Sequence, residues 1–147
     1  MAYDPAALLS MINRAFALES FFLAGDRLTP EEFRHRMETG TFLTLDDAGA
    51  LAAAVWVQPR GDRAYMGLLT VDPDRQGRGL GSRMVEQAEQ YCRAQGARFL
   101  DITVVNLREE LPPFYRKRGY VETGTAQFDP NRPLRRECHL IEMSKPL

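Results

Sequence analysis

The segment that most constrains the fold of this chain leads from an apolar strand into a glycine-rich turn. Residues 69–81 read Leu-Thr-Val-Asp-Pro-Asp-Arg-Gln-Gly-Arg-Gly-Leu-Gly, so glycines alternate at positions 77, 79 and 81. Glycine adopts left-handed backbone conformations readily and leaves neighbouring N–H groups unshielded. At the start of a helix such N–H groups bind anions, especially phosphates. The segment therefore predicts a strand, a tight anion-binding turn and a helix in succession.

Size and charge limit the class of protein. The chain has 147 residues and a formal net charge of −1, so we expect one domain over 1–147 and no nucleic-acid partner. No apolar run approaches the roughly 20 residues that cross a bilayer. The start of the chain lacks a secretory-signal pattern, and the two cysteines lack metal-type spacing. We therefore expect a cytoplasmic protein with neither a membrane nor a metal partner.

Hydrophobic periodicity predicts an alternation of helices and strands. Helices are expected at 5–20, 29–39, 79–95 and 114–118, and strands at 41–45, 50–58, 63–71, 99–105, 120–125 and 137–143. The first three strands follow one another through short turns, which predicts an antiparallel meander. The strand–helix–strand order around the glycine turn favours parallel pairing of the third and fourth strands. The fold class is thus α/β, with a mixed, mostly antiparallel sheet flanked by helices.

The glycine spacing excludes two common nucleotide-binding motifs. A P-loop ends in Gly-Lys-Ser/Thr, but no lysine precedes Ser82. A dinucleotide fingerprint reads Gly-x-Gly-x-x-Gly, whereas the glycines here alternate. Residues 76–81 instead match Gln-x-x-Gly-x-Gly, between a strand that ends in Val-Asp-Pro and an amphipathic helix. In these features the chain resembles the GNAT superfamily of acyl-CoA-dependent N-acetyltransferases.

The resemblance implies a GNAT fold and a binding mode for acetyl-CoA. In that family the turn holds the pyrophosphate of coenzyme A, and the end of the preceding strand pairs with the pantetheine arm. The implied cofactor-binding residues are Leu69, Thr70, Val71, Gln76, Gly77, Arg78, Gly79, Leu80, Gly81 and Ser82. A turn that merely joins a strand to a helix is the structural alternative.

A later segment also resembles the family. Residues 114–120 read Phe-Tyr-Arg-Lys-Arg-Gly-Tyr, and the resemblance implies that Tyr115 protonates the leaving thiolate. A phenol has a pKa near 10, which suits that task. Asn106 stands where relatives contact the pantetheine with an asparagine. Its separation from Tyr115 is longer than the family's usual one, so a loop-capping role is the alternative.

The proton acceptor and the acceptor site have several candidates. Asp101 takes the place of a glutamate that acts as base in some relatives, although an arginine could instead hold it in a structural role. Glu19 is the second candidate base, and with Phe22 it lies where the family builds the acceptor site. A water relay is equally compatible. Arg132, Arg135 and Arg136 either favour the binding of an acidic acceptor or simply belong to a solvated surface loop.

These expectations combine into a function. The chain is predicted to transfer an acetyl or other short acyl group from acetyl-CoA to a primary amine of a small-molecule or peptide acceptor, by direct attack. The alternative is a CoA-binding sensor or interaction domain without catalysis. The family usually begins with a strand, but here a helix begins by Pro5. The sheet is therefore expected to lack that edge strand or to take one from another subunit, which makes a homodimer possible.

Overall fold

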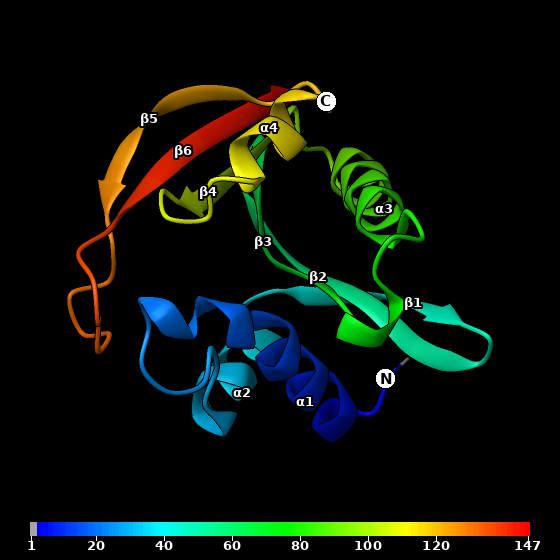
Figure 1. Cartoon of the computed structure of the whole chain (residues 1–147). Coiled ribbons are helices and arrows are strands. Elements are labelled where there is room, and N and C mark those ends of the chain that lie inside the picture. Colours follow the sequence, from blue (N-terminus) through cyan, green and yellow to red (C-terminus); the bar gives the residue numbers. More distant parts are fainter. Residues whose placement is uncertain (1–2) are drawn as a thin grey trace.

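The computed structural model describes residues 3–147 as helices and strands around a single sheet (Figure 1). The helices are α1 (Pro5–Ala15), α2 (Pro30–Thr39), α3 (Leu80–Ala94) and α4 (Leu111–Arg116), with 3-10 helices η1 (Phe16–Phe21) and η2 (Pro73–Arg75). The strands are β1 (Thr41–Asp47), β2 (Ala50–Arg60), β3 (Arg63–Val71), β4 (Phe99–Val105), β5 (Val121–Gln127) and β6 (His139–Pro146). Apart from the short η1 and η2, this is the predicted order of elements.

The sheet is mixed, with strand order β1-β2-β3-β4-β6-β5. β3 and β4 are parallel and the other pairs are antiparallel. The predicted meander of β1, β2 and β3 and the predicted parallel pair are therefore both confirmed. β1 and β5 form the two edges, and within residues 3–147 no strand precedes α1.

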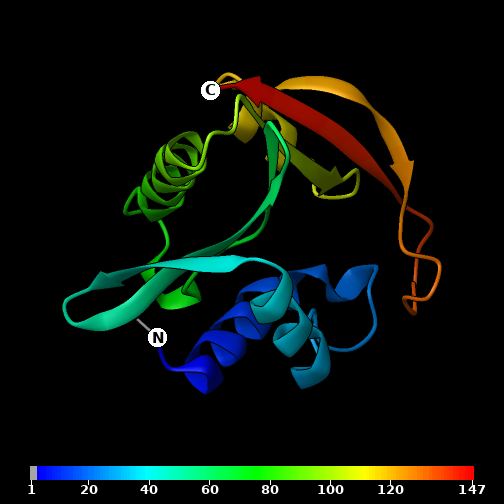
Figure 2. The same cartoon turned by 180° about the vertical axis from the view of Figure 1, so that it is seen from behind.

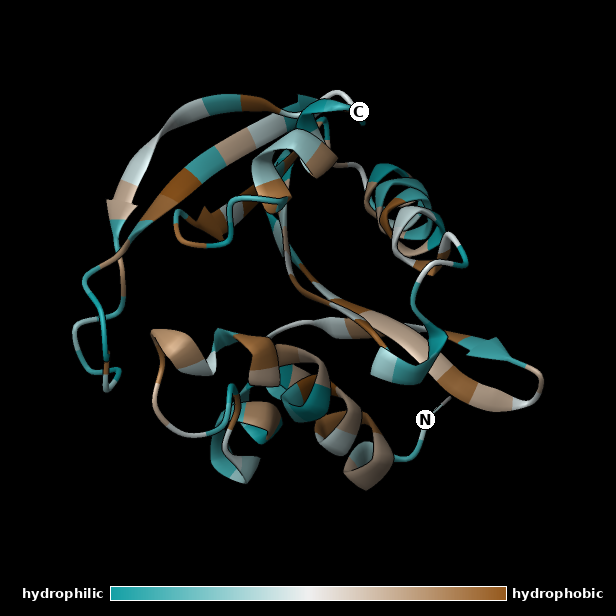
Figure 3. Ribbon diagram, in the orientation of Figure 1, coloured by the Kyte–Doolittle hydropathy of each residue, from teal (hydrophilic) through white to brown (hydrophobic). Residues whose placement is uncertain are grey.

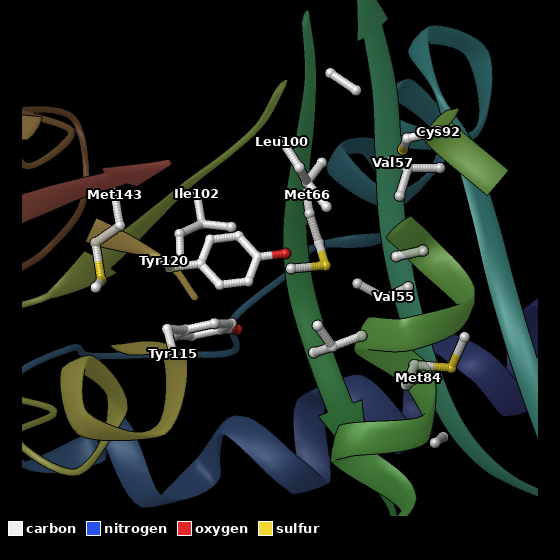
Figure 4. Close-up of a cluster of buried hydrophobic side chains, with 14 of the residues drawn as sticks. Val55, Val57, Met66, Met84, Cys92, Leu100, Ile102, Tyr115, Tyr120 and Met143 are labelled. Atoms are coloured by element: carbon white, nitrogen blue, oxygen red, sulfur yellow. The ribbon is translucent and has the colours of Figure 1, made fainter. Parts of the chain in front are cut away.

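Helices cover both faces of the sheet, as Figures 1 and 2 show from opposite sides. α3 packs on one face through Met84 and Cys92, and α1 packs on the other through Ile12. Side chains alternate between the faces along a strand, so β2 places Val57 in the α3 layer and Trp56 in the α1 layer. Figure 4 shows the α3 layer, which extends to the tyrosines after β4.

The helix boundaries follow from local chemistry. The predicted capping box forms at α2, where Thr29 and Glu32 exchange side-chain to backbone hydrogen bonds of 2.9 and 3.1 Å. The first predicted helix is wrong beyond Ala15, where it tightens into η1, because apolar spacing over one turn fits both helix types. α4 begins at Leu111, earlier than predicted, since its two prolines occupy a first turn whose N–H groups need no partner.

A bulge in β3 reverses the faces of its side chains. Met66 packs in the α3 layer and Leu68 in the α1 layer, although a regular strand would put both on one face. The register with β2 shifts between Ala54 and Trp56, and Leu68 has a φ of 55°, which is rare outside glycine. The Thr70 hydroxyl donates to the Leu68 carbonyl at 2.9 Å. Bulges bend a strand, and this one lies where β3 separates from β4.

The connection between β5 and β6, residues 128–138, is called here the closing loop. Its backbone bonds the segment between η1 and α2, from Ala24 N–H to the Pro133 carbonyl at 2.9 Å and from Arg135 N–H to the Phe22 carbonyl at 2.7 Å. Figure 3 shows a mostly hydrophilic loop, at the far side of the molecule from α3. The closing loop is thus bound to the η1–α2 segment, at the end of the molecule remote from the glycine turn.

Candidate active site

A cavity lies where β3 and β4 separate. The two strands pair only over residues 63–65 and 99–101, so within the described chain the rest of the β3 edge facing β4 has no strand partner. A cavity of about 530 Å³ occupies this opening and reaches β3, β4, η1, α4, the closing loop and the start of α3. An unpaired strand edge can hydrogen-bond an extended ligand as an added strand would.

The glycine turn, residues 76–82, forms one end of this cavity. Gly77 and Gly79 have φ values of 79° and 74°, and an added Cβ at either position would meet no atom within 4 Å. Space is therefore open on the side where a ligand would lie. No side chain caps the first N–H groups of α3, and uncapped N–H groups at a helix start attract anions.

Most residues predicted to bind the cofactor border the cavity. The lining includes Leu69, Val71, Gln76, Gly77, Gly79, Leu80, Gly81 and Ser82. Thr70 and Arg78 are not in the lining: the Thr70 hydroxyl supports the bulge, and the Arg78 guanidinium binds Asp47 at 2.8 Å. The Ser82 hydroxyl accepts a hydrogen bond from Arg118, whose guanidinium stacks on Phe114. Cofactor contacts by all these residues stay predictions.

Tyr115 borders the cavity between its two ends. The side chain is buried, and its ring lies 5.5 Å from that of Tyr120 (Figure 4). Within residues 3–147 the Tyr115 hydroxyl makes no hydrogen bond, whereas every fully buried polar side-chain atom in that range does make one. The Tyr115 oxygen is therefore not fully buried, and it is open to the cavity that the residue lines. Burial raises the pKa of Tyr115 above its ordinary value, so the phenol keeps its proton through the neutral range.

Asn106 is engaged with the start of β6. The side-chain carbonyl of Asn106 accepts a hydrogen bond from the backbone N–H of His139 at 2.8 Å, and the backbone N–H of Asn106 donates to the His139 carbonyl at 3.0 Å. This is the arrangement that a loop-capping residue makes. Asn106 is not among the residues that line the cavity, and contact between its side-chain amide and the cofactor stays a prediction.

The two candidate bases lie in different surroundings. Asp101 binds Arg63 through two hydrogen bonds of 2.8 and 2.6 Å, and this contact lowers the pKa of the carboxyl group. Asp101 is also outside the cavity lining. Glu19 is buried in η1, lines the cavity and accepts from Arg108 at 2.8 Å. The geometry thus favours Glu19 over Asp101 as the group near the reaction.

Phe22 lies behind the cavity wall. Its side chain is fully buried and packs edge-on against Phe21, with ring centroids 4.9 Å apart. It is not among the lining residues. A direct contact of Phe22 with an acceptor stays a prediction, and the contact seen is structural.

Sequence reasoning missed three arginines at the end of the cavity remote from the glycine turn. Arg27, Arg36 and Arg108 line the cavity there with Arg132. Arg36 follows the buried Phe33 at a spacing that puts both on one helix face, so periodicity in α2 could have indicated it. Arg27 and Arg108 lie in connections, where no local pattern predicts which way the chain turns.

Among residues 3–147 no group of three or more His, Cys, Asp and Glu side chains is arranged to hold a metal ion. No helix in that range is long and apolar enough to span a membrane.

Comparisons with known proteins agree with this architecture. Residues 9–120 match the model of the acetyltransferase (GNAT) family. The chain is 33% identical over 111 residues to glucosamine 6-phosphate N-acetyltransferase 1 of Oryza sativa subsp. japonica, covering 65% of this chain and 66% of that protein. It is 27% identical over 126 residues to mycothiol acetyltransferase of Propionibacterium freudenreichii subsp. shermanii, covering 76% of this chain but 39% of that protein.

A solved structure shows the same fold over the whole chain. The ribosomal-protein-S18-alanine N-acetyltransferase of Escherichia coli superposes with a TM-score of 0.78 at 20% identity, covering 99% of this chain and 89% of that one. The chain spans about two fifths to two thirds of the two curated relatives described above. The family match, the splayed parallel strands and the glycine turn together show that this chain belongs to the GNAT acetyltransferase family.

Proposed function

We propose that this protein transfers an acetyl or other short acyl group from acetyl-CoA to a primary amine by direct attack. The observation that carries the proposal is the opening between β3 and β4. It leads from the glycine turn, past the unpaired β3 edge, to the Tyr115 hydroxyl. An anion site, a strand edge and a proton donor thus follow one another along a single cavity.

The described residues fit coenzyme A in three respects. The backbone at Gly77 and Gly79 has open space beside it, where a pyrophosphate can approach the N–H groups. The free β3 edge near Leu69 can pair with the amide groups of a pantetheine arm. Arg118 lies at the same turn through its hydrogen bond to Ser82, so a guanidinium is also available to phosphate oxygens.

Acetyl-CoA supplies the activated acyl group as a thioester. The chain's residues hold both reactants in one cavity, which replaces a bimolecular encounter by a pre-arranged one. Backbone N–H groups near Val71 polarise the thioester carbonyl. The Tyr115 hydroxyl, kept protonated by its burial, donates its proton to the departing sulfur. Glu19 or an ordered water receives the proton of the amine.

Removal of the Tyr115 hydroxyl tests this proposal. Tyr115→Phe should lower kcat by about 10²- to 10⁴-fold, the range of general acid catalysis, and leave the affinity for acetyl-CoA nearly unchanged. Steady-state release of CoA thiol and calorimetric titration with acetyl-CoA measure the two quantities. Tyr120→Phe is the matched control, because its hydroxyl binds Glu89 at 2.8 Å and is not in the cavity lining.

A CoA-binding domain without catalysis is the alternative outcome. It predicts tight binding of acetyl-CoA, no turnover with any amine and no difference between the two tyrosine variants. Equal activity of Tyr115→Phe and the unaltered protein would leave the enzyme intact but remove Tyr115 from its mechanism. The open hydroxyl of Tyr115 favours the enzyme, because a purely structural tyrosine would be bonded as Tyr120 is.

A further inference from the structure

Positive charge gathers at the end of the cavity remote from the glycine turn. Four arginines and two acidic residues line that end, namely Arg27, Arg36, Arg108, Arg132, Glu19 and Asp129. They come from η1, α2 and three connections that the fold brings together. The cavity therefore carries an excess of cationic side chains where the amine acceptor would enter.

Two of these arginines are neutralised by carboxylates. Arg108 donates to Glu19 at 2.8 Å, and its side chain is 12% exposed. Arg132 donates to Glu32 at 2.7 Å, and its side chain is 15% exposed. The second pair also links the closing loop to α2. Both arginines thus have a structural partner before any ligand binds.

The other two arginines have no acidic partner in the described chain. Within residues 3–147 neither Arg27 nor Arg36 makes a side-chain hydrogen bond or an ion pair within 4 Å. Arg36 lies over the Trp56 ring at 4.4 Å and Arg27 near the Phe16 ring at 5.6 Å. Aromatic faces hold a guanidinium in place while leaving its N–H donors available.

The backbone around Arg27 is rigidly placed. The next residue, Leu28, exchanges two hydrogen bonds of 2.9 Å with the Asn13 side chain of α1. Arg27 therefore projects into the cavity from a fixed point and not from a loose loop. Such placement is expected of a residue that recognises a ligand.

These charges are energetically unfavourable in the absence of an anion. Burial lowers the pKa of both Arg27 and Arg36. Glu19 partly offsets this effect at Arg27 and Tyr65 does so at Arg36, whereas the charge of Arg132 adds to it at each. Desolvated like charges destabilise one another. A bound anion would relieve the repulsion and accept the unused N–H donors, and the guanidinium fork matches a carboxylate or a phosphate.

We propose that Arg27 and Arg36 bind an anionic group, a carboxylate or a phosphate, of a small acceptor whose primary amine receives the acetyl group. This inference rests on the proposed transferase function. In the step itself the amine nitrogen bonds to the acetyl carbon and the carbon–sulfur bond breaks. The thiolate takes the Tyr115 proton, and the amine releases one to Glu19 or water.

The position of the arginines distinguishes this anion from the phosphates of the cofactor. The glycine turn and α3 lie across the molecule from the closing loop (Figure 1), and Arg27 and Arg36 lie on the side of the loop and α2. The backbone bonds of Ala24 and Arg135 tie that loop to the η1–α2 segment. This wall favours a small acceptor over a folded protein, and the excess positive charge opposes a polyamine.

The experiment compares amines that differ in one anionic group. Alanine is paired with alaninamide, glucosamine 6-phosphate with glucosamine, and spermidine serves as the cationic arm. We expect kcat/KM to be about 10- to 100-fold higher for the anionic member of at least one pair, as charge-assisted hydrogen bonds allow. Preference for alanine identifies a carboxylate, and preference for glucosamine 6-phosphate identifies a phosphate.

Variants assign the preference to the arginines. Arg27→Gln and Arg36→Gln should each reduce it about tenfold or more, mainly through KM, and Arg27→Lys should restore part of it. Arg34→Gln is the matched control, because Arg34 lies on the exposed face of the same helix as Arg36. Thermal denaturation with CoA, with and without each amine, checks folding and binding independently of turnover.

The outcomes separate the inference from the proposed function. Acetylation without preference for an anionic member, best activity with spermidine, or a preference that both Gln variants retain would overturn the inference and leave the transferase standing. Stabilisation by the anionic amines that Arg27→Gln abolishes, with no turnover of any amine, would uphold the anion site and reject the transferase. Neither turnover nor stabilisation by any anionic amine would reject both.

Discussion

Asp101 shows how a residue at a chemically suggestive position can serve the fold. Its carboxylate binds Arg63 through two hydrogen bonds, and Arg63 also donates to the Ser144 hydroxyl at 3.0 Å. The contact joins β3, β4 and β6 at the place where β3 and β4 are still paired. From the sequence we expected Asp101 either to act as the base or to be held in a structural contact, and the contact with Arg63 is the one that the structure contains. Only the fold shows that an arginine reaches it.

Replacement of Asp101 should affect stability and leave catalysis intact. Its pKa is lowered in the folded protein, so its stabilising effect is present above the unfolded pKa of about 3.9 and is lost as the pH falls through the lower folded value. Asp101→Asn should therefore be slightly less stable than the unaltered protein at pH 7, and the difference should shrink as the pH falls below about 3.9. Urea denaturation from pH 7 to pH 3 measures this.

The same variant decides whether Asp101 is the base. If the proton of the amine goes to Glu19 or water, kcat of Asp101→Asn stays close to that of the unaltered protein. Loss of a general base would instead lower kcat by about 10²-fold or more. Such a loss, with an unchanged unfolding midpoint, would return Asp101 to the mechanism.

At the scale of elements, the glycine turn depends on two left-handed residues. Gly79→Ala should lower stability by about 1 kcal/mol, since alanine is strained at its φ of 74°, and should also weaken acetyl-CoA binding by displacing the N–H groups of the turn. Gly61→Ala is the control, because Gly61 has a φ of 69° in the β2–β3 turn, at the opposite end of β3 from the glycine turn. Chemical denaturation and calorimetry should show equal destabilisation but lost affinity only for Gly79→Ala.

The positions of β3 and β4 could be predicted from the sequence, but the bulge in β3 could not. β3 and β4 lie at 63–71 and 99–105 as predicted, because β-branched and apolar residues between glycine or polar turns give a strong local signal. The left-handed Leu68 arises from pairing with β2 and from the Thr70 hydrogen bond. That arrangement is set by tertiary structure. Likewise the backbone next to Arg27 is held by the Asn13 side chain of α1, a contact between segments far apart in the sequence.

At the scale of the whole molecule, two hydrophobic layers share one sheet. Leu8 belongs to the α1 layer and Met84 to the α3 layer, and both side chains are fully buried. β2 contributes to both layers through adjacent residues, Trp56 and Val57. Loss of either layer therefore removes support from a strand that the other needs. The chain should unfold as one cooperative unit, as single domains of this size commonly do.

This coupling is tested by disrupting one layer and observing the other. Leu8→Ala and Met84→Ala should each lower the unfolding free energy by about 2–5 kcal/mol. Trp56 is the single tryptophan, so its fluorescence reports on the α1 layer, and far-ultraviolet circular dichroism reports on all helices and strands. If the chain unfolds as one unit, fluorescence and circular dichroism give the same unfolding midpoint in each variant. Two variants of equal unfolding free energy, one at Leu8 and one at Met84, should then shift the midpoint of the Trp56 fluorescence transition equally. A Trp56 midpoint that ignores Met84→Ala would show that the layers unfold separately.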